Sequence, residues 1–301
     1  MENKEKSTMT RREYMKAYKK NSAFVENTRV FMRNKLAIAG FIIFLIVVLF
    51  ALFANVICDY DSVVIAINPA ERLMKPCAEH IFGTDELGRD IFGRLIHGAR
   101  ISLRIGLLSV LISLTIGGII GAVSGFFGGV IDNVIMRAMD VFMCLPAMLL
   151  AIAIVAAFGA SEFNMMIAIA ISTVPQCARI VRSSILSVRG FDYVEAARAL
   201  GLSTPAIIFK HVLVNGIAPI IVWATMAVAK AITQVAGLSF LGLGIAAPAP
   251  EWGTMLSASR GYMRDFPHLV LAPGLAIFFT VLAFNLMGDG LRDALDPKLR
   301  H

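Results

Sequence analysis

Long apolar runs, separated by short polar connections, fill most of the chain after its first 35 residues. A run of about 18 or more apolar residues is long enough to cross a bilayer as a helix. Such runs predict six membrane-spanning helices, at about residues 36–58, 101–127, 134–158, 164–181, 217–242 and 269–287. The pattern therefore predicts an all-α integral membrane protein.

Composition strengthens this prediction and bears on the N-terminus. Only 16% of the residues are charged, against about 25% in a typical soluble domain. The first 35 residues are polar, and no short apolar region with a small-residue cleavage site follows them. We therefore expect no cleavable signal peptide.

Basic residues gather at the N-terminus and set the expected topology. Residues 1–35 hold ten Lys and Arg and four Glu, which is most of the net charge of +7. Basic segments next to a span stay in the cytoplasm, and six crossings then return the C-terminus to the same side. The inner segments so defined hold 19 of the 28 Lys and Arg, and the outer segments hold 8. The charge is thus explained by topology, and no nucleic-acid partner is expected.

This topology divides the chain into four segments. Residues 1–35 are a basic cytoplasmic tail, and 36–99 are the first span with an extracytoplasmic segment. Residues 100–289 are a core of five spans with cytoplasmic helices at 192–213, and 290–301 are a cytoplasmic C-terminus. A second outer segment is expected at about 247–267.

Prolines and glycines interrupt the predicted spans. A proline removes a helix hydrogen bond, which neighbouring helices or water can replace in a membrane. Glycines spaced four residues apart allow another helix to approach closely, and we interpret them as ordinary helix packing. These residues are Pro146, Pro175, Pro219 and Pro273, and Gly117, Gly121, Gly125 and Gly129.

The cytoplasmic stretch 192–213 has the pattern of two short helices joined by a turn. Asp192 can cap the first helix, with Glu195 three residues later as in a capping box. Gly201 fits the left-handed position that ends a helix. Ser203 or Thr204 can then cap a second helix.

One face of the first short helix is predicted to be narrow, with small residues at its centre. Tyr193, Ala196, Ala197 and Leu200 share a side through their spacing of three and four residues. A two-turn helix is marginal in water, so it must pack on something. Packing on a partner and packing on the chain's own membrane end are equally compatible with this pattern.

Glu195, Ala196, Ala197 and the following Gly201 resemble the EAA loop of bacterial ATP-binding-cassette (ABC) importer permeases. That family implies a type I importer transmembrane fold. In it the EAA helix docks on an ATPase subunit. By this resemblance Glu195, Ala196, Ala197 and Gly201 form the docking core, and Tyr193, Arg198 and Leu200 flank it. The chain departs from the family at the end of the loop, where Val214 stands in place of the usual proline.

Three further stretches are similar to the dipeptide, oligopeptide and nickel permeases of that family, and most similar to dipeptide C subunits. They are residues 80–90, 250–256 and 284–297, and the similarity runs from about residue 33 to the end. The first stretch is a turn-rich outer motif. We expect its charged side chains to pair with each other rather than with substrate. Its residues are Gly83, Thr84, Asp85, Gly88, Arg89 and Asp90.

The resemblance implies a set of partners and a location in the inner membrane. They are a homologous B-type permease, one or two ATP-binding subunits that use ATP and Mg, an extracytoplasmic solute-binding protein, and the lipid bilayer. Small peptides are the implied substrate, and nickel is the alternative. Import rather than export is implied by the resemblance alone.

The chain lacks the residue patterns of a catalytic or metal site. It has no Gly-rich phosphate loop, and its five histidines and four cysteines have no ligand spacing. We therefore expect no enzyme activity and no cofactor in this chain. Cys58 and Cys77 fall on the outer side and could pair, although unpaired thiols are favoured.

Lys230 is the one ionisable residue predicted deep inside a span, and Gln234 follows one turn later. Such a residue usually faces the bundle interior or an aqueous path. We hypothesise that both residues line the translocation path and that Lys230 favours a peptide carboxylate. An equal alternative is that backbone carbonyls or an acid of the partner permease hold Lys230.

Two other classes of protein remain possible from the sequence. A stand-alone secondary transporter would need ion sites near the middle of the membrane and internal repeats. No repeat is visible. A membrane scaffold would have no need of repeated helix-breaking prolines.

Overall fold

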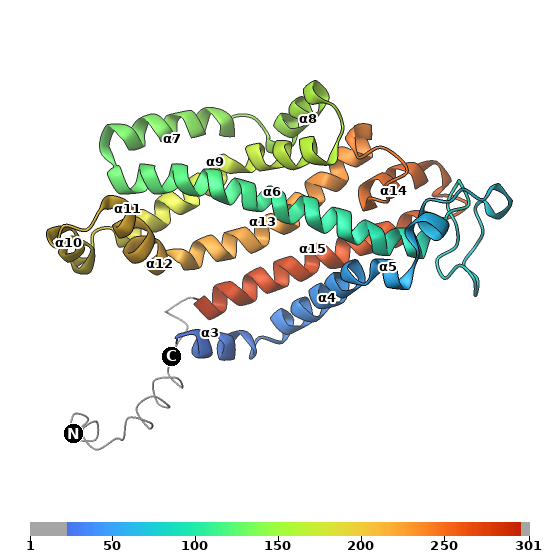
Figure 1. Ribbon diagram of the computed structural model, residues 1–301, viewed down its shortest axis with the longest axis horizontal. Coiled ribbons are helices and arrows are strands. Elements are labelled where there is room, and N and C mark those ends of the chain that lie inside the picture. Colours follow the sequence, from blue (N-terminus) through green and yellow to red (C-terminus); the bar gives the residue numbers. More distant parts are fainter. Residues whose placement is uncertain (1–22, 296–301) are drawn as a thin grey trace, which may run out of the picture.

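The apolar runs fold into long helices that lie side by side (Figure 1). The computed structural model describes residues 23–295. Within this range it contains no β-strand, only an isolated bridge between Thr84 and Asp90. The α-helices are α3 (Ala23–Phe31), α4 (Lys35–Leu52), α5 (Ala54–Ile57), α6 (Ile91–Phe127), α7 (Gly129–Met143), α8 (Ala147–Phe158), α9 (Glu162–Val188), α10 (Asp192–Ala199), α11 (Thr204–Ile207), α12 (Leu213–Asn215), α13 (Ile217–Leu238), α14 (Trp252–Ser259) and α15 (His268–Leu295).

Five helices are long and apolar enough to cross a membrane, namely α4, α6, α9, α15, and α13 with its extension to Leu243. The expected third span, 134–158, is wrong as a single helix, because α7 and α8 meet at an angle of 80°. The break lies before Pro146. A proline cannot donate a helix hydrogen bond, and it disfavours helical backbone in the residue before it.

The second span begins about ten residues earlier than predicted. Asp90 caps α6 by accepting a hydrogen bond from the Gly93 N–H at 2.7 Å. The predicted segment boundary at residue 99 therefore falls inside a helix. Arg94 and Arg100 lower the hydropathy here, but they donate to backbone carbonyls of Val64 and Ala51, both at 3.0 Å.

The four glycines predicted to mediate packing do not all do so. Three of them, Gly117, Gly121 and Gly125, lie against α9, where an added Cβ would overlap its atoms. Gly129 lies at the start of α7 with a φ of 56° and has no atom near its Cβ position. The three α6 glycines therefore allow the close α6–α9 contact that is the centre of the bundle, and Gly129 serves the turn between α6 and α7.

The prolines also differ in their roles. Pro175 and Pro273 lie inside α9 and α15. The expectation for Pro219 is wrong, because it is the third residue of α13. In the first turn of a helix the N–H has no partner within the helix, so proline removes nothing there.

The two ends of the bundle carry different elements (Figure 1). Helices α10 to α12 lie at one end, and α5, α14 and the 59–90 segment lie at the other. At the α10 end, Asn34 before α4 donates to Asp293 of α15 at 3.1 Å, so the described ends of the chain are adjacent. Residues 1–22 of the predicted basic tail and 296–301 of the predicted C-terminal segment lie outside the described residues.

Candidate functional site

Helix α10 forms where the sequence predicts it, with one change at its start. The residue at the N-cap position is Phe191, and no side chain caps the helix. The predicted capping box is therefore wrong. Asp192 and Glu195 lie instead in the first turn, where acidic side chains interact favourably with the helix dipole.

The end of α10 follows the prediction for Gly201, whose φ is 76°. The Gly201 N–H donates to Arg198 O at 3.0 Å, and the Leu202 N–H donates to Ala197 O at 3.2 Å. These two bonds form a Schellman motif, which satisfies the last carbonyls of the helix. The chain then enters α11, for which Ser203 is the N-cap residue.

The predicted docking residues do not share one face. Val194 and Ala197 are 0% and 5% exposed and pack in a core cluster of this chain with residues of α9 and α11. Placing Ala197 on the open side of the helix is therefore wrong, because it anchors α10 to the rest of the molecule. The residues that remain exposed are Tyr193, Glu195, Ala196, Arg198, Leu200 and Gly201, which we call the α10 outer face.

Sequence analysis missed Phe191, which extends this surface. Its side chain is 53% exposed, and its ring lies 5.8 Å from the ring of Tyr193. Leu200 at the other end is 80% exposed. Large apolar side chains exposed outside a bilayer-facing surface indicate a contact with another protein. The signal in the sequence is an aromatic residue just before an amphipathic helix.

Short polar links join the long helices near α10. Arg189, between α9 and α10, donates to Gly125 O of α6 at 2.7 Å. Arg182 of α9 forms a two-bond pair with Asp132 of α7, at 2.5 and 2.6 Å. Ser184 of α9 donates to the carbonyl of Gly216 before α13. These bonds join α9 and its C-cap residue to α6, α7 and the start of α13, and α10 itself packs beside α9 through the apolar cluster that contains Val194 and Ala197.

Lys230 and Gln234 lie on α13, but they differ in exposure. Lys230 is exposed, and no hydrogen bond or ion pair of the described chain involves it. Gln234 is partly buried, and its amide oxygen is covered without a partner. Arginines also lie within the long helices. Arg179 of α9, for example, pairs with Asp140 of α7 at 2.7 Å.

At the opposite end of the bundle, residues 83–90 form a compact cap. Gly83 and Gly88 both have a φ of 76°, as tight turns require. Asp85 accepts from Arg89 Nε at 2.7 Å and lies 3.4 Å from Arg94 Nε of α6. The expected pairing within the motif is thus observed.

Thr84 and Asp90 tie the same cap together. Thr84 is fully buried, donates to Glu71 O, and accepts from the Met74 N–H at 2.9 Å. Asp90 caps α6 and also lies 2.8 Å from His80 Nδ1. Every polar side chain of the motif therefore has a structural role.

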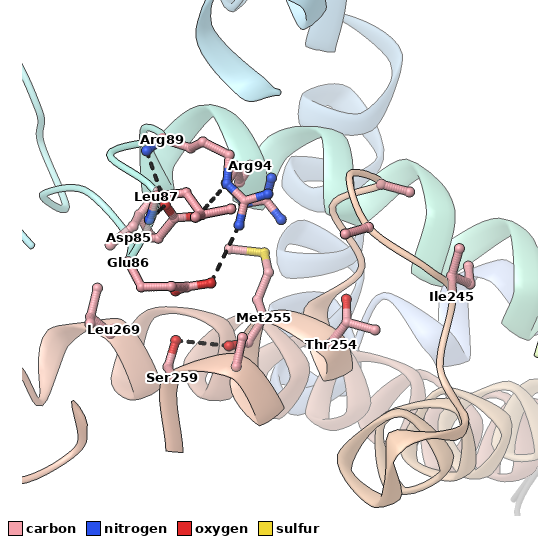
Figure 2. Close-up of a pocket in the computed structure, with 14 residues that line it drawn as sticks. Asp85, Glu86, Leu87, Arg89, Arg94, Ile245, Thr254, Met255, Ser259 and Leu269 are labelled. Carbon is pink, nitrogen blue, oxygen red and sulfur yellow. Dashed lines mark hydrogen bonds and ion pairs between the residues drawn. The ribbon is translucent and has the colours of Figure 1, made fainter. Parts of the chain in front are cut away.

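A cavity of about 160 Å³ lies between this cap and α14. Asp85, Glu86, Arg89 and Arg94 line one side, and Met255 and Ser259 line the other (Figure 2). The two carboxylates balance the two guanidinium groups. The charged lining of the cavity is therefore neutral overall.

Glu251 is a buried acid that sequence analysis did not single out. It is 1% exposed and caps α14 by accepting from Gly253 N and Thr254 N at 2.7 and 2.8 Å. Ser102 of α6 donates to it at 3.3 Å. Burial raises the pKa of Glu251. The available signal was an acid directly before an apolar helix start.

The structure contains no metal cluster or disulfide in the part of the chain that it describes. No group of three or more His, Cys, Asp or Glu could hold a metal among residues 23–295. Cys58, Cys77, Cys144 and Cys177 are free thiols.

His80 gives the cap a predicted pH dependence. Its hydrogen bond with Asp90, aided by Glu71 at 3.4 Å, raises the pKa of His80 above 6.5. The stabilisation is present below 6.5 and is lost as pH rises through the raised value. We expect the thermal midpoint of the purified complex to decrease as pH rises from about 6.5 through the raised pKa of His80, and His80→Gln to make this decrease shallower. An equally steep slope in His80→Gln would assign the pH dependence to other groups.

Comparison with known families gives two matches along the chain. Residues 117–301 match the family described as "Binding-protein-dependent transport system inner membrane component". Residues 22–76 match the family described as "N-terminal TM domain of oligopeptide transport permease C".

Curated relatives match over most of their length. A dipeptide transport system permease protein of Alkalihalophilus pseudofirmus is 47% identical over 89% of this chain and 88% of its own. A di/tripeptide transport system permease protein of Pseudomonas aeruginosa is 46% identical, over 90% and 91%. A glutathione transport system permease protein of Pectobacterium atrosepticum is 43% identical, over 90% of each.

Solved structures show the same fold at low identity. A chain of an inward-facing MetNI methionine ABC transporter matches with a TM-score of 0.56 and 16% identity, over 67% of this chain and 97% of that chain. A chain of an amino acid ABC transporter matches with a TM-score of 0.52 and 18% identity, over 68% and 95%. The type I importer fold expected from the sequence is confirmed.

Proposed function

The chain belongs to the family of binding-protein-dependent transport system inner membrane components, and from this premise we propose that it transports small peptides. It is a multi-pass inner-membrane permease subunit of an ABC importer. The observation that carries the peptide assignment is the 47% identity to a dipeptide permease along 89% of the chain. The other relatives are named for di/tripeptides and for glutathione, which is itself a tripeptide, so nickel is not favoured.

We propose that the substrate passes between this chain and a homologous B-type permease. ATP and Mg are used by one or two separate ATP-binding subunits, and an extracytoplasmic binding protein delivers the peptide. This chain holds no cofactor and catalyses no reaction of its own. Family membership supports these separate roles of the subunits. It does not favour the two alternatives, a stand-alone secondary transporter and a membrane scaffold.

We propose that the α10 outer face is where an ATP-binding subunit docks. Its exposed Tyr193 and Leu200, together with Phe191, support this assignment. Movement of α10 would reach α9 through their apolar packing, and the bonds of Arg189 and Arg182 would pass it on to α6 and α7.

We propose that the α10 end of the bundle faces the cytoplasm, with both termini on that side. The bias of Lys and Arg supports this orientation. The adjacency of Asn34 and Asp293 is compatible with it, because an even number of crossings brings both ends to one side.

The test is uptake in cells that lack only this chain and have no other peptide transporter. We expect loss of labelled dipeptide or longer-peptide uptake, and full recovery when the intact gene is returned. Labelled nickel serves as the internal comparison and should enter normally. Loss of nickel uptake alone, with peptides unaffected, would overturn the peptide assignment.

A further inference from the structure

We propose that Lys230 binds the carboxylate of the transported peptide, an inference that rests on the proposed function. Lys230 lies thirteen residues after Ile217, the first residue of α13, which is about 20 Å along the helix. This distance places it near the middle of a span. Its neighbours Ala229 and Ala231 are buried, at 1% and 0% exposed. The helix is therefore packed on its other sides, and Lys230 lies on the side that this chain leaves open.

Lys230 differs from the other cations of the long spans α6, α9 and α13. Every arginine in these helices has a partner within the chain, whereas no hydrogen bond or ion pair in the described residues involves Lys230. The five partnered arginines are Arg94 with Asp85, Arg100 with Ala51 O, Arg104 with Glu162, Arg179 with Asp140, and Arg182 with Asp132. These arginines are satisfied by the fold, so Lys230 is the unpaired Lys or Arg within these three helices.

A free ammonium group near mid-membrane cannot face lipid without a large cost. It must therefore face water, an anion, or an acid of another chain. The residues three and four positions later on α13 are polar but carry no negative charge. The hydroxyl of Thr233 donates to the carbonyl of Ala229 at 3.0 Å, and the amide oxygen of Gln234 is covered. Of these groups, Lys230 alone presents a charge to the open side.

The charge of Lys230 selects a particular part of the substrate. The C-terminal carboxylate of a peptide is ionised at neutral pH, with a pKa near about 3.5. Every unmodified peptide carries this group, whatever its side chains. A lysine at this depth would attract the carboxylate and repel the N-terminal ammonium group. One residue can thus orient many peptides without reading their sequence.

The experiment compares uptake of a labelled dipeptide with uptake of the same dipeptide carrying a C-terminal amide. The full transporter is used, with the wild-type chain and with Lys230→Gln. We expect Lys230→Gln to lower uptake of the free acid about tenfold relative to the amide, as for loss of one charge-assisted contact. The wild-type and Lys230→Gln transporters use the same binding protein. Its own preference for acid or amide therefore cancels when the acid-to-amide uptake ratios of the two transporters are compared.

Two further variants make the result specific. Lys230→Arg keeps the charge and should keep the wild-type ratio. Lys35→Gln removes an exposed lysine at the first residue of α4 and should change neither uptake nor the ratio. These controls separate the charge at position 230 from net charge and from general effects of the substitution.

The inference fails if Lys230→Gln lowers uptake of acid and amide equally or leaves both unchanged. It also fails if the variant no longer co-purifies with the partner permease while Lys230→Arg does, because Lys230 would then pair with an acid of that partner. Absence of peptide uptake by the wild-type transporter is a different outcome, which overturns the proposed function instead.

Discussion

Ala196→Asp is expected to abolish peptide uptake while leaving the protein folded, whereas Ala197→Asp is expected to destabilise it. The two alanines are neighbours on α10, but Ala196 is exposed and Ala197 is 5% exposed. An exposed carboxylate destabilises the free permease little. In a docking surface, however, it would lose its water when the ATP-binding subunit binds. We expect at least a tenfold loss of ATP-binding-subunit affinity, since central interface residues contribute about 2 kcal/mol or more.

Ala197→Asp places a carboxylate among Val194, Ile207 and other apolar side chains of the core cluster. A buried, unpaired charge costs several kcal/mol, so the cytoplasmic segment should lose its packing. The measurements are the thermal midpoint of the purified permease, co-purification of the ATP-binding subunit, and uptake. Ala196→Asp should lower only the last two. Normal co-purification and uptake in Ala196→Asp would show that the ATPase docks elsewhere.

Leu200→Ala provides a milder form of the same test. Leu200 is 80% exposed, so its truncation removes little packing within this chain. A loss of uptake with an unchanged thermal midpoint would therefore report on a partner. This choice of variants depends on the structure, because the sequence places Ala196 and Ala197 on the same side of the helix.

Features governed by local rules could be predicted from the sequence. Gly201 adopts the positive φ that was predicted for it, and Gly83 and Gly88 adopt the same φ of 76° within the motif that was predicted to be rich in turns. The long helices could be predicted from the apolar runs, because length and hydropathy are also local properties of the sequence. The break before Pro146 lies where that proline was recognised as an interruption, although its angle depends on tertiary packing.

Features that depend on distant segments could not be predicted. The start of α6 was missed because Arg94 and Arg100 count as polar in any hydropathy window, while Val64 and Ala51 supply their acceptors. The burial of Ala197 likewise depends on the position of Ile207, which a helix-face argument does not contain. In both cases the missing information is a contact between segments.

The contact between α6 and α9 gives the second prediction. A Cβ at Gly121 would overlap the carbonyl oxygen of Ala178 and would lie 2.9 Å from Val181 Cβ, so α9 would have to move away. We expect Gly121→Ala to destabilise the permease by about 1–3 kcal/mol, as overpacking does in a close-packed core. Because α10 packs beside α9, and Arg189 at the end of α9 bonds to α6, a displaced α9 should lower uptake as well.

Gly118→Ala is the matched control, because it lies in the same helix and no atom lies within 4 Å of its Cβ position. Alanine favours a helix over glycine by about 1 kcal/mol, so this variant should be neutral or slightly more stable. The gain in helix propensity is the same in both variants. The difference between their thermal midpoints therefore reports on packing alone. If Gly121→Ala were as stable as Gly118→Ala, the close approach of α6 and α9 would not be a source of stability, and the role assigned to the glycine spacing would be wrong.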